Sequence, residues 1–191
     1  MQASTACTVF LYFSERNADT MITIHPTQPH EAQTLITIQK AAFFPLWERY
    51  RDAGNPHLRG VDDILRRLEH PFWRYFTICE DETIVGGIAY KLAGRTDFYD
   101  PLPEGMIYLG RLYIDPAHQN RSIAQTAITL SEHTFPNARS FAVDFPEDLS
   151  MNRRCYEKAG FRDTGMRFEV QPGELPQQRR LVLACFGKQI G

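Results

Sequence analysis

The fold is decided by the stretch YLGRLYIDPAHQNRSIAQTAITLSEH, residues 108–133. The apolar run 108–114 is typical of a buried strand, and Pro116 ends it because proline has no N–H to continue a ladder. Ser122, with Gln125 three residues later, matches a Ser-x-x-Gln capping box and predicts that a helix begins there. The stretch therefore predicts a strand, a polar loop and a helix in direct succession.

The polar loop has the features of an anion site. Residues 119–124 place several backbone N–H groups, and the positive end of a helix dipole, at the carboxyl end of the strand. The small residues Ser122 and Ala124 allow a diphosphate to approach the main chain, and Arg121 can add a charge-assisted contact. An ordinary solvated connection between strand and helix remains the alternative.

Composition limits the class of protein. The 191 residues are 43% hydrophobic, which suffices for one sizeable core and one domain. Lys and Arg total 21 against 23 Asp and Glu, so the net charge of -2 does not indicate a basic surface that would bind nucleic acid or an anionic membrane. The four cysteines form no Cys-x-x-Cys pair, which favours a reduced cytoplasmic protein without a metal site.

The first 20 residues differ from the rest. They contain an apolar run that is too short to span a bilayer and that no basic region precedes, so we interpret residues 1–20 as an extension or an upstream start. Residues 21–191 are expected to form a single domain.

Strand and helix signals alternate along that domain. Periodicity predicts helices over 29–43, 61–70, 122–133 and 152–160, and strands over 21–25, 73–93 (two, around a turn at 80–82), 108–114, 140–145, 161–170 and 179–187. Residues 44–60 are expected to form a helical turn and a loop, and 94–105 an exposed loop. The pattern indicates an α/β fold of the α+β type, a layered sheet with both faces at least partly covered.

A second motif lies in the helix predicted over 152–160. Asn152 and Tyr156 are four residues apart and therefore share one helix face, whereas Cys155 and Ala159 share an apolar face that can pack inward. A single tyrosine in such a place is more typical of packing than of catalysis.

The two motifs together resemble the GCN5-related N-acetyltransferase (GNAT) superfamily. The matching elements are the strand LGRLYIDP, then Gln119-x-x-Ser122-x-Ala124, and later Asn152 followed by YEKAGF, residues 156–161. The resemblance covers roughly residues 78–186. It implies a layered α/β/α fold whose central mixed, largely antiparallel sheet has about six to seven strands.

The resemblance also implies an acetyl-coenzyme A site that needs no metal. Main-chain groups of the loop would hold the pyrophosphate, and the strand backbone would pair with the pantetheine arm. Asn152, a candidate catalytic residue with Tyr156 and Asp144, would contact that arm or the region where the amine attacks. The residues implied are Leu112, Tyr113, Ile114, Gln119, Asn120, Arg121, Ser122, Ile123, Ala124, Asn152 and Tyr156. The family usually has glycine where this chain has Ser122; we expect Ser122 to act as a helix cap rather than to adopt a positive φ.

The chemistry needs an acid and a base. Under the resemblance, the Tyr156 hydroxyl lies near the thioester sulfur, where a protonated phenol can donate to the departing thiolate. A strand N–H such as that of Ile114 would stabilise the oxyanion. The strand 108–114 carries no carboxylate, so Asp144 is the candidate base, directly or through water; a carboxylate that caps the loop before Pro146 is the alternative.

The variable connections beside the cofactor groove are expected to form the acceptor pocket. They contain four aromatic residues that could line it or simply pack beneath long loops: Trp47, Tyr50, Phe98 and Tyr99. Nearby Asp97, Asp100 and Glu104 favour a cationic amine or a peptide N-terminus. His118 is interpreted as an exposed turn residue.

The expected function is therefore acetyl-CoA-dependent transfer of an acetyl group to a primary amine of a small molecule or peptide, by direct attack in a ternary complex. A non-catalytic acyl-CoA binding or sensing module on the same fold is the alternative. An unrelated nucleotide binder is disfavoured because the chain has no P-loop lysine and no Rossmann glycine triplet. A cytoplasmic monomer or homodimer without nucleic-acid or membrane partners is expected.

Overall fold

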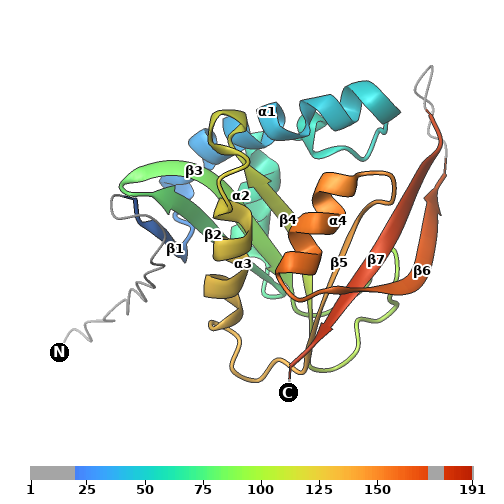
Figure 1. Cartoon of the computed structure of the whole chain (residues 1–191). Helices are drawn as coiled ribbons and strands as arrows, with labels where there is room; N and C mark the ends of the chain where they lie inside the picture. The colour runs from blue at the N-terminus through green and yellow to red at the C-terminus, as the bar shows by residue number, and fades with distance from the viewer. Residues whose placement is uncertain (1–19, 172–178, 191) are drawn as a thin grey trace.

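A seven-stranded mixed sheet forms the centre of the protein (Figure 1). The computed structural model describes residues 20–171 and 179–190. The strand order is β1-β2-β3-β4-β5-β7-β6, and all neighbours are antiparallel except β4 and β5. This architecture confirms the expected fold class.

The elements follow the predicted order. The strands are β1 (Ile22–Pro26), β2 (Trp73–Glu80), β3 (Thr83–Lys91), β4 (Met106–Ile114), β5 (Ser140–Pro146), β6 (Arg162–Val170) and β7 (Leu181–Gln189). The helices are α1 (Ala32–Tyr50), α2 (Val61–Glu69), α3 (Ile123–Glu132) and α4 (Ser150–Lys158), with short 3-10 turns η1 (Pro29–Glu31), η2 (Pro56–Leu58) and η3 (Pro116–His118). Most of the predicted N-terminal extension, residues 1–20, lies outside the described residues.

Helices cover both faces of the sheet. On one face α3 and α4 lie side by side (Figure 1), and α3 packs Ile123, Ala127 and Ile128 into the larger core cluster. On the other face α1 and α2 bury Leu35 and Ile64 in a second cluster. Spacings of four and five residues on α3 place its apolar side chains on a single helical stripe.

Helix α1 extends further than the sequence suggests. The prediction ended the helix at residue 43, but the structure continues it through Pro45 to Tyr50, so that prediction was wrong. Pro45 removes one hydrogen bond but does not end the helix, because the following turn packs and the Tyr50 side chain is buried. The helix ends at Arg51, which is left-handed (φ 54°) and whose N–H donates to the Trp47 carbonyl.

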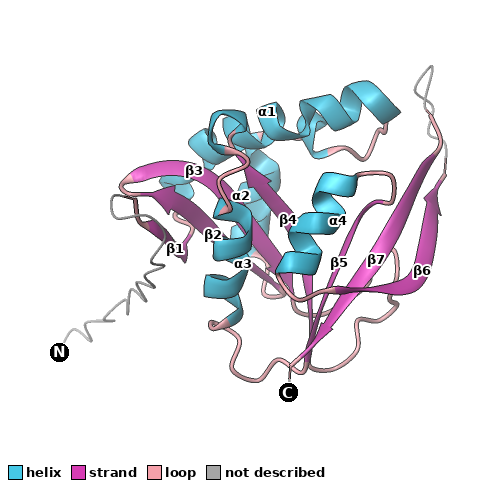
Figure 2. Ribbon diagram, viewed as in Figure 1, coloured by secondary structure: helices cyan, strands magenta, loops and turns pink. Residues whose placement is uncertain are grey.

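The two parallel strands part halfway along their length. β4 and β5 pair from Met106–Ser140 to Leu109–Val143. Beyond that point β4 stays paired with β3 and β5 stays paired with β7, so the two strands diverge (Figure 2). We call this divergence the β4–β5 splay.

A β-bulge sits where the splay begins. Tyr90 pairs with Leu109 and Ala89 with Arg111, so Gly110 is an extra residue on β4. The extra residue sends Leu109 into the core beneath α3, whereas Arg111 lies on the α1–α2 face with Ala89. A Cβ at position 110 would stand 2.7 Å from the Trp73 ring, which explains why glycine occupies the bulge.

Candidate functional site

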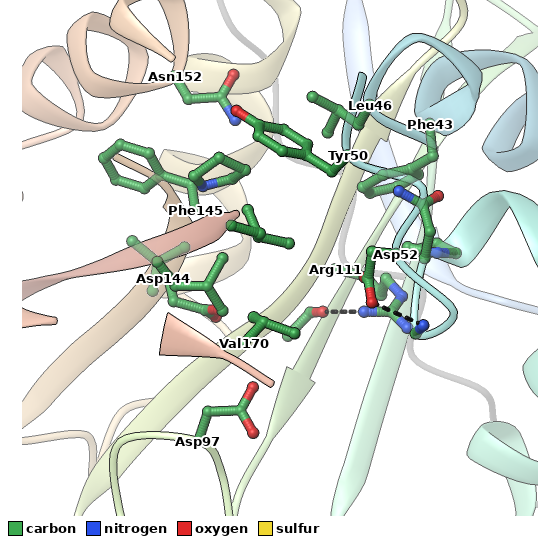
Figure 3. Close-up of a pocket in the computed structure, with 18 of the residues that line it drawn as sticks. Phe43, Leu46, Tyr50, Asp52, Asp97, Arg111, Asp144, Phe145, Asn152 and Val170 are labelled. Atoms are coloured by element: carbon green, nitrogen blue, oxygen red, sulfur yellow. Dashed lines mark hydrogen bonds between the residues drawn. The ribbon is translucent and has the colours of Figure 1, made fainter. Parts of the chain in front are cut away.

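A cavity of about 320 Å³ opens at the splay (Figure 3). Helices of both sheet faces contribute to it, because α4 borders it from one face and the end of α1 from the other. Its lining includes Phe43, Leu46, Tyr50, Asp52, Asn55, Asp97, the β4 residues 109–112, the β5 residues 143–146, Asn152, Tyr156, Phe168, Val170, Leu181 and Leu183. The cavity thus joins the two faces of the sheet at one point.

Tyr156 presents its hydroxyl to this cavity from a rigid position. Its ring stacks on Phe145 (centroids 5.1 Å apart) and meets Phe161 edge-on (5.9 Å). The hydroxyl makes no hydrogen bond within the described part of the chain, although the residue is buried. Burial raises the pKa of Tyr156 well above 10, so the phenol stays protonated at neutral pH.

Asn152 stands one turn before Tyr156 on α4 and also lines the cavity. Figure 3 shows its amide and the Tyr50 hydroxyl pointing toward one another from α4 and α1. Tyr50 donates a hydrogen bond to Asp148, which Arg49 also contacts, and this tie holds the end of α1 against the loop that leads into α4. The wall of the cavity on the α1 side is therefore fixed to α4.

Asp144 reaches the cavity from β5. The Tyr108 hydroxyl donates a hydrogen bond to its carboxylate, so the side chain bonds across to β4. Burial raises the pKa of Asp144 above its ordinary value; Asp97 adds to the rise, and the Tyr108 hydrogen bond and the Arg111 charge oppose it. A carboxylate with a raised pKa beside a cavity is a better proton acceptor than an ordinary surface carboxylate.

The loop between β4 and α3 is tightly constrained. The Asp115 side chain accepts from the Ala117 N–H (2.9 Å), and the Gln119 side-chain amide donates to the Ile114 carbonyl (2.9 Å). Asn120 and Ser122 are both left-handed, with φ 62° and 63°. The backbone therefore turns sharply twice before α3 begins.

The expectation for Ser122 was wrong in its geometry. Ser122 occupies the N-cap position, but its side chain makes no cap hydrogen bond and its φ is positive. A side-chain cap requires extended backbone at that position, which a left-handed residue does not provide. The strained backbone, rather than the hydroxyl, shapes this end of the helix.

Two sets of backbone groups remain available around the loop. In the described chain no acceptor receives the N–H groups of Ile123 and Ala124 at the start of α3. The Asp115 N–H donates to the Val85 carbonyl on β3 (2.7 Å). Along a strand, the N–H groups of successive residues point alternately to the two neighbouring strands. The N–H groups of Leu112 and Ile114 therefore point away from β3, toward the splay.

The charged residues of the loop are engaged elsewhere. Arg121 pairs with the buried Glu80 (2.6 Å), and His118 contacts the same carboxylate (2.7 Å). His118 is therefore partly buried and bonded, whereas the sequence suggested an exposed turn residue. With Arg121 held by Glu80, main-chain N–H groups are the donors that the loop offers to an anion.

The structure separates the four predicted aromatic residues. Only Tyr50 lines the cavity. Trp47 stacks with Phe44, Phe98 packs on Phe168, and Tyr99 lies beside Cys185, as the packing alternative expected. Among the nearby acids, Asp97 lines the cavity, Asp100 pairs with Arg95 (3.5 Å), and Glu104 is exposed.

Two residues that the sequence analysis did not single out complete the site: Tyr108, the donor to Asp144, and Arg111. The signal for Arg111 was its charge inside the otherwise apolar strand YLGRLYI. The described ranges contain no cluster of His, Cys, Asp and Glu able to hold a metal ion. Neither do they contain a helix long and apolar enough to cross a membrane.

The left-handed backbone at position 122 gives a direct test. We expect Ser122→Gly to raise the free energy of unfolding by up to about 1 kcal/mol, because glycine adopts positive φ without the penalty of a Cβ. The change would be measured as the midpoint of urea unfolding. Ser122→Ala is the matched control: it removes the hydroxyl but keeps the strain, so it should not stabilise the protein. A stability loss in Ser122→Gly would mean that the hydroxyl supports the loop.

Comparison with known proteins agrees with this geometry. The model of the acetyltransferase (GNAT) family matches residues 33–161. A search of curated proteins finds no match.

Solved structures share the fold at low sequence identity. The PaiA N-acetyltransferase of Thermoplasma acidophilum, in complex with coenzyme A, is 15% identical with a TM-score of 0.60, covering 88% of this chain and 99% of its own. YncA of Salmonella typhimurium, solved with its cofactor acetyl-CoA, is 16% identical (TM-score 0.64; coverage 88% and 93%). The spermidine N-acetyltransferase of Vibrio cholerae, in complex with CoA and spermine, is 12% identical (TM-score 0.64; coverage 88% and 95%).

These likenesses concern the fold, while the family match spans most of the chain and includes both motifs that carry the resemblance. The chain therefore belongs to the acetyltransferase (GNAT) family.

Proposed function

We propose that the protein is an acetyl-CoA-dependent N-acetyltransferase that moves the acetyl group to a primary amine of a small molecule or peptide, by direct attack in a ternary complex. The observation that carries the proposal is the cavity at the splay. It brings the Tyr156 hydroxyl from the α4 face and the Asp144 carboxylate from the α1 face to one space between β4 and β5.

The donor side fits acetyl-CoA, the acetyl-donating co-substrate. The first N–H groups of α3 suit a pyrophosphate, and the outward-facing N–H groups of Leu112 and Ile114 suit the amides of a pantetheine arm laid along β4 like an added strand. Gln119 holds the loop onto Ile114 and so fixes the distance between these two contacts. The solved relatives bound to coenzyme A and acetyl-CoA support the same placement by analogy.

The acceptor side supplies the base. Asp144 takes the amine proton, directly or through a water molecule, as the amine nitrogen forms a bond to the thioester carbonyl carbon. The N–H of Ile114 faces the splay and can stabilise negative charge that develops on the carbonyl oxygen. As the carbon–sulfur bond breaks, the Tyr156 phenol donates a hydrogen bond to the leaving thiolate. Asn152, one helical turn away, orients the pantetheine arm.

A raised pKa decides how Tyr156 acts. A free thiol has a pKa of about 8.5 and an ordinary phenol about 10. Since burial raises the pKa of Tyr156 further, complete proton transfer to the thiolate is uphill at first, and the phenol contributes mainly as a hydrogen-bond donor. A buried donor aimed at developing charge is still effective in a site of low dielectric constant.

Calorimetric titration of the purified protein with acetyl-CoA and with coenzyme A tests the proposal. We expect Kd values in the micromolar range, about -8 kcal/mol of binding free energy, for both ligands. Transfer to an amine should then release free thiol in proportion to the acetylated product. Absence of binding would remove the proposed function, whereas binding without turnover on any amine would favour a sensing module.

We also propose that the protein is cytoplasmic. Cys79, Cys155 and Cys185 are free thiols, which is compatible with a reducing cytoplasm. Burial raises the pKa of Cys79 and Cys155 to about 11, so both are poor nucleophiles at neutral pH.

A further inference from the structure

Arg111 is a half-buried arginine with few hydrogen-bond partners. It lies on β4 just after the bulge and lines the cavity on the α1–α2 face. Its Nη1 donates to the neighbouring Gly110 carbonyl (3.0 Å), while its Nε is buried and has no partner among the described residues. A guanidinium carries five N–H donors, so most of its hydrogen-bonding capacity is unused.

No described carboxylate forms an ion pair with this guanidinium. The nearby Asp63 is already bound by Arg66 (3.2 Å) and Arg67 (3.1 Å). Burial, followed by the positive charge of Arg67, lowers the pKa of Arg111, while Asp63, Tyr75 and Asp144 act in the opposite direction without cancelling the effect. A buried and unpaired cation is costly, and in proteins such a group generally has a counterion or binds an anionic ligand.

The other charged residues that line the cavity are acidic, and none of them forms an ion pair with Arg111 among the described residues. Asp144, Asp52 and Asp97 all line it. Asp52 already accepts from the Gly54 N–H (2.9 Å), and Asp144 accepts from the Tyr108 hydroxyl. Figure 3 shows Asp144 and Arg111 at opposite sides of the cavity. The space between them is therefore bordered by opposite charges. On one side is the Asp144 carboxylate, which can accept a proton, and on the other is the Arg111 guanidinium, whose N–H groups can bind a carboxylate.

We propose that Arg111 binds the carboxylate of an amino-acid acceptor whose primary amine faces Asp144, an assignment that rests on the acetyltransferase function proposed above. The planar fork of arginine matches a carboxylate with two parallel hydrogen bonds. Free amino acids carry the amine and the carboxylate on one carbon, so they present both charges within a small cavity. A polyamine, which has only positive charges, meets repulsion at Arg111.

The test compares matched acceptors on the wild-type protein. Each L-amino acid is assayed beside its amide, which keeps the amine and the shape but lacks the negative charge, and beside its decarboxylated amine. Spermidine is included as a cationic acceptor. Initial rates of thiol release at saturating acetyl-CoA give kcat/KM for each compound. For the preferred side chain we expect kcat/KM of the acid to exceed that of the amide by at least about tenfold.

Variants at position 111 assign the preference to this side chain. In Arg111→Met, which keeps the length but removes the charge, the ratio of acid to amide should fall toward one. Arg111→Lys keeps a positive charge without the fork and should give an intermediate ratio. Acetyl-CoA affinity, measured by calorimetry for each variant, separates an effect on the acceptor from one on the donor.

The possible results divide clearly. A wild-type protein that acetylates amides, amines or spermidine as well as acids overturns the inference but leaves the acetyltransferase function intact. A ratio unchanged in Arg111→Met, with weaker acetyl-CoA binding, assigns Arg111 to the coenzyme and overturns it as well. Loss of acetyl-CoA binding by the wild type removes the proposed function, and the inference with it. The wild-type comparison needs no variant, so poor folding of Arg111→Met does not affect it.

Discussion

Replacing Tyr156 with phenylalanine is expected to lower kcat on the order of 100-fold while leaving the Kd for acetyl-CoA nearly unchanged. The hydroxyl has no partner in the described chain, so its removal breaks no internal hydrogen bond, and the ring keeps its stack on Phe145. Only the donor to the leaving thiolate is lost. Single-turnover rates and calorimetric titration of the same preparation would measure the two quantities.

The matched control is Tyr90→Phe. Tyr90 is also a buried tyrosine with a raised pKa, but its hydroxyl bonds Ser131 (2.6 Å) within the core beneath α3. This variant should lose stability rather than turnover. If Tyr156→Phe keeps its full kcat, the phenol is a packing residue and the sensing alternative gains weight.

The Asp144→Asn variant should lose between about 10²- and 10⁴-fold in kcat/KM at neutral pH. Asparagine can still accept the Tyr108 hydrogen bond through its side-chain oxygen, so the fold and the cavity should persist. What is lost is the group that takes the amine proton. Asp62→Asn, the same change at an exposed residue of α2, should leave turnover unaltered.

The pH profile distinguishes a base from a structural carboxylate. A base acts only when deprotonated, and burial raises the pKa of Asp144, so wild-type kcat/KM should show one limb that rises with pH through that raised pKa and a second limb that belongs to the acceptor amine. Asp144→Asn should lack this acidic limb and keep only the limb that belongs to the acceptor amine. An unchanged acidic limb in the variant would assign it to another group.

Much of the fold could be predicted because the signals were local. The strand 108–114, its proline stop and the apolar stripe of α3 follow from periodicity within a few residues, and the structure places them as expected. The end of α1 could not be predicted in that way. A proline at position 45 normally indicates a helix end, and only the tertiary burial of Tyr50 shows why the helix continues.

The candidate site was less accessible to sequence reasoning. Asn152 and Tyr156 come from one helix, and their shared face follows from a spacing of four residues. The partnership of Tyr108 with Asp144 joins two strands, and that of Arg121 with Glu80 joins a loop to a distant strand end, so no local pattern indicates either. Ser122 was misjudged because a serine before a helix usually caps it, whereas here the turn imposes a positive φ.

The bulge at Gly110 determines how this strand should be compared with others. Before the bulge, odd-numbered residues such as Leu109 face α3. After the bulge, even-numbered residues face α3, so Leu112 and Ile114 pack there and Arg111 does not. Deleting Gly110 would restore a regular ladder and leave the side chains of residues 111–114 on their present faces, although a residue count from the strand start would change by one. Sequences of other strands should therefore be aligned by counting from the bulge, because an alignment anchored at the strand start would match acceptor-facing residues with core residues.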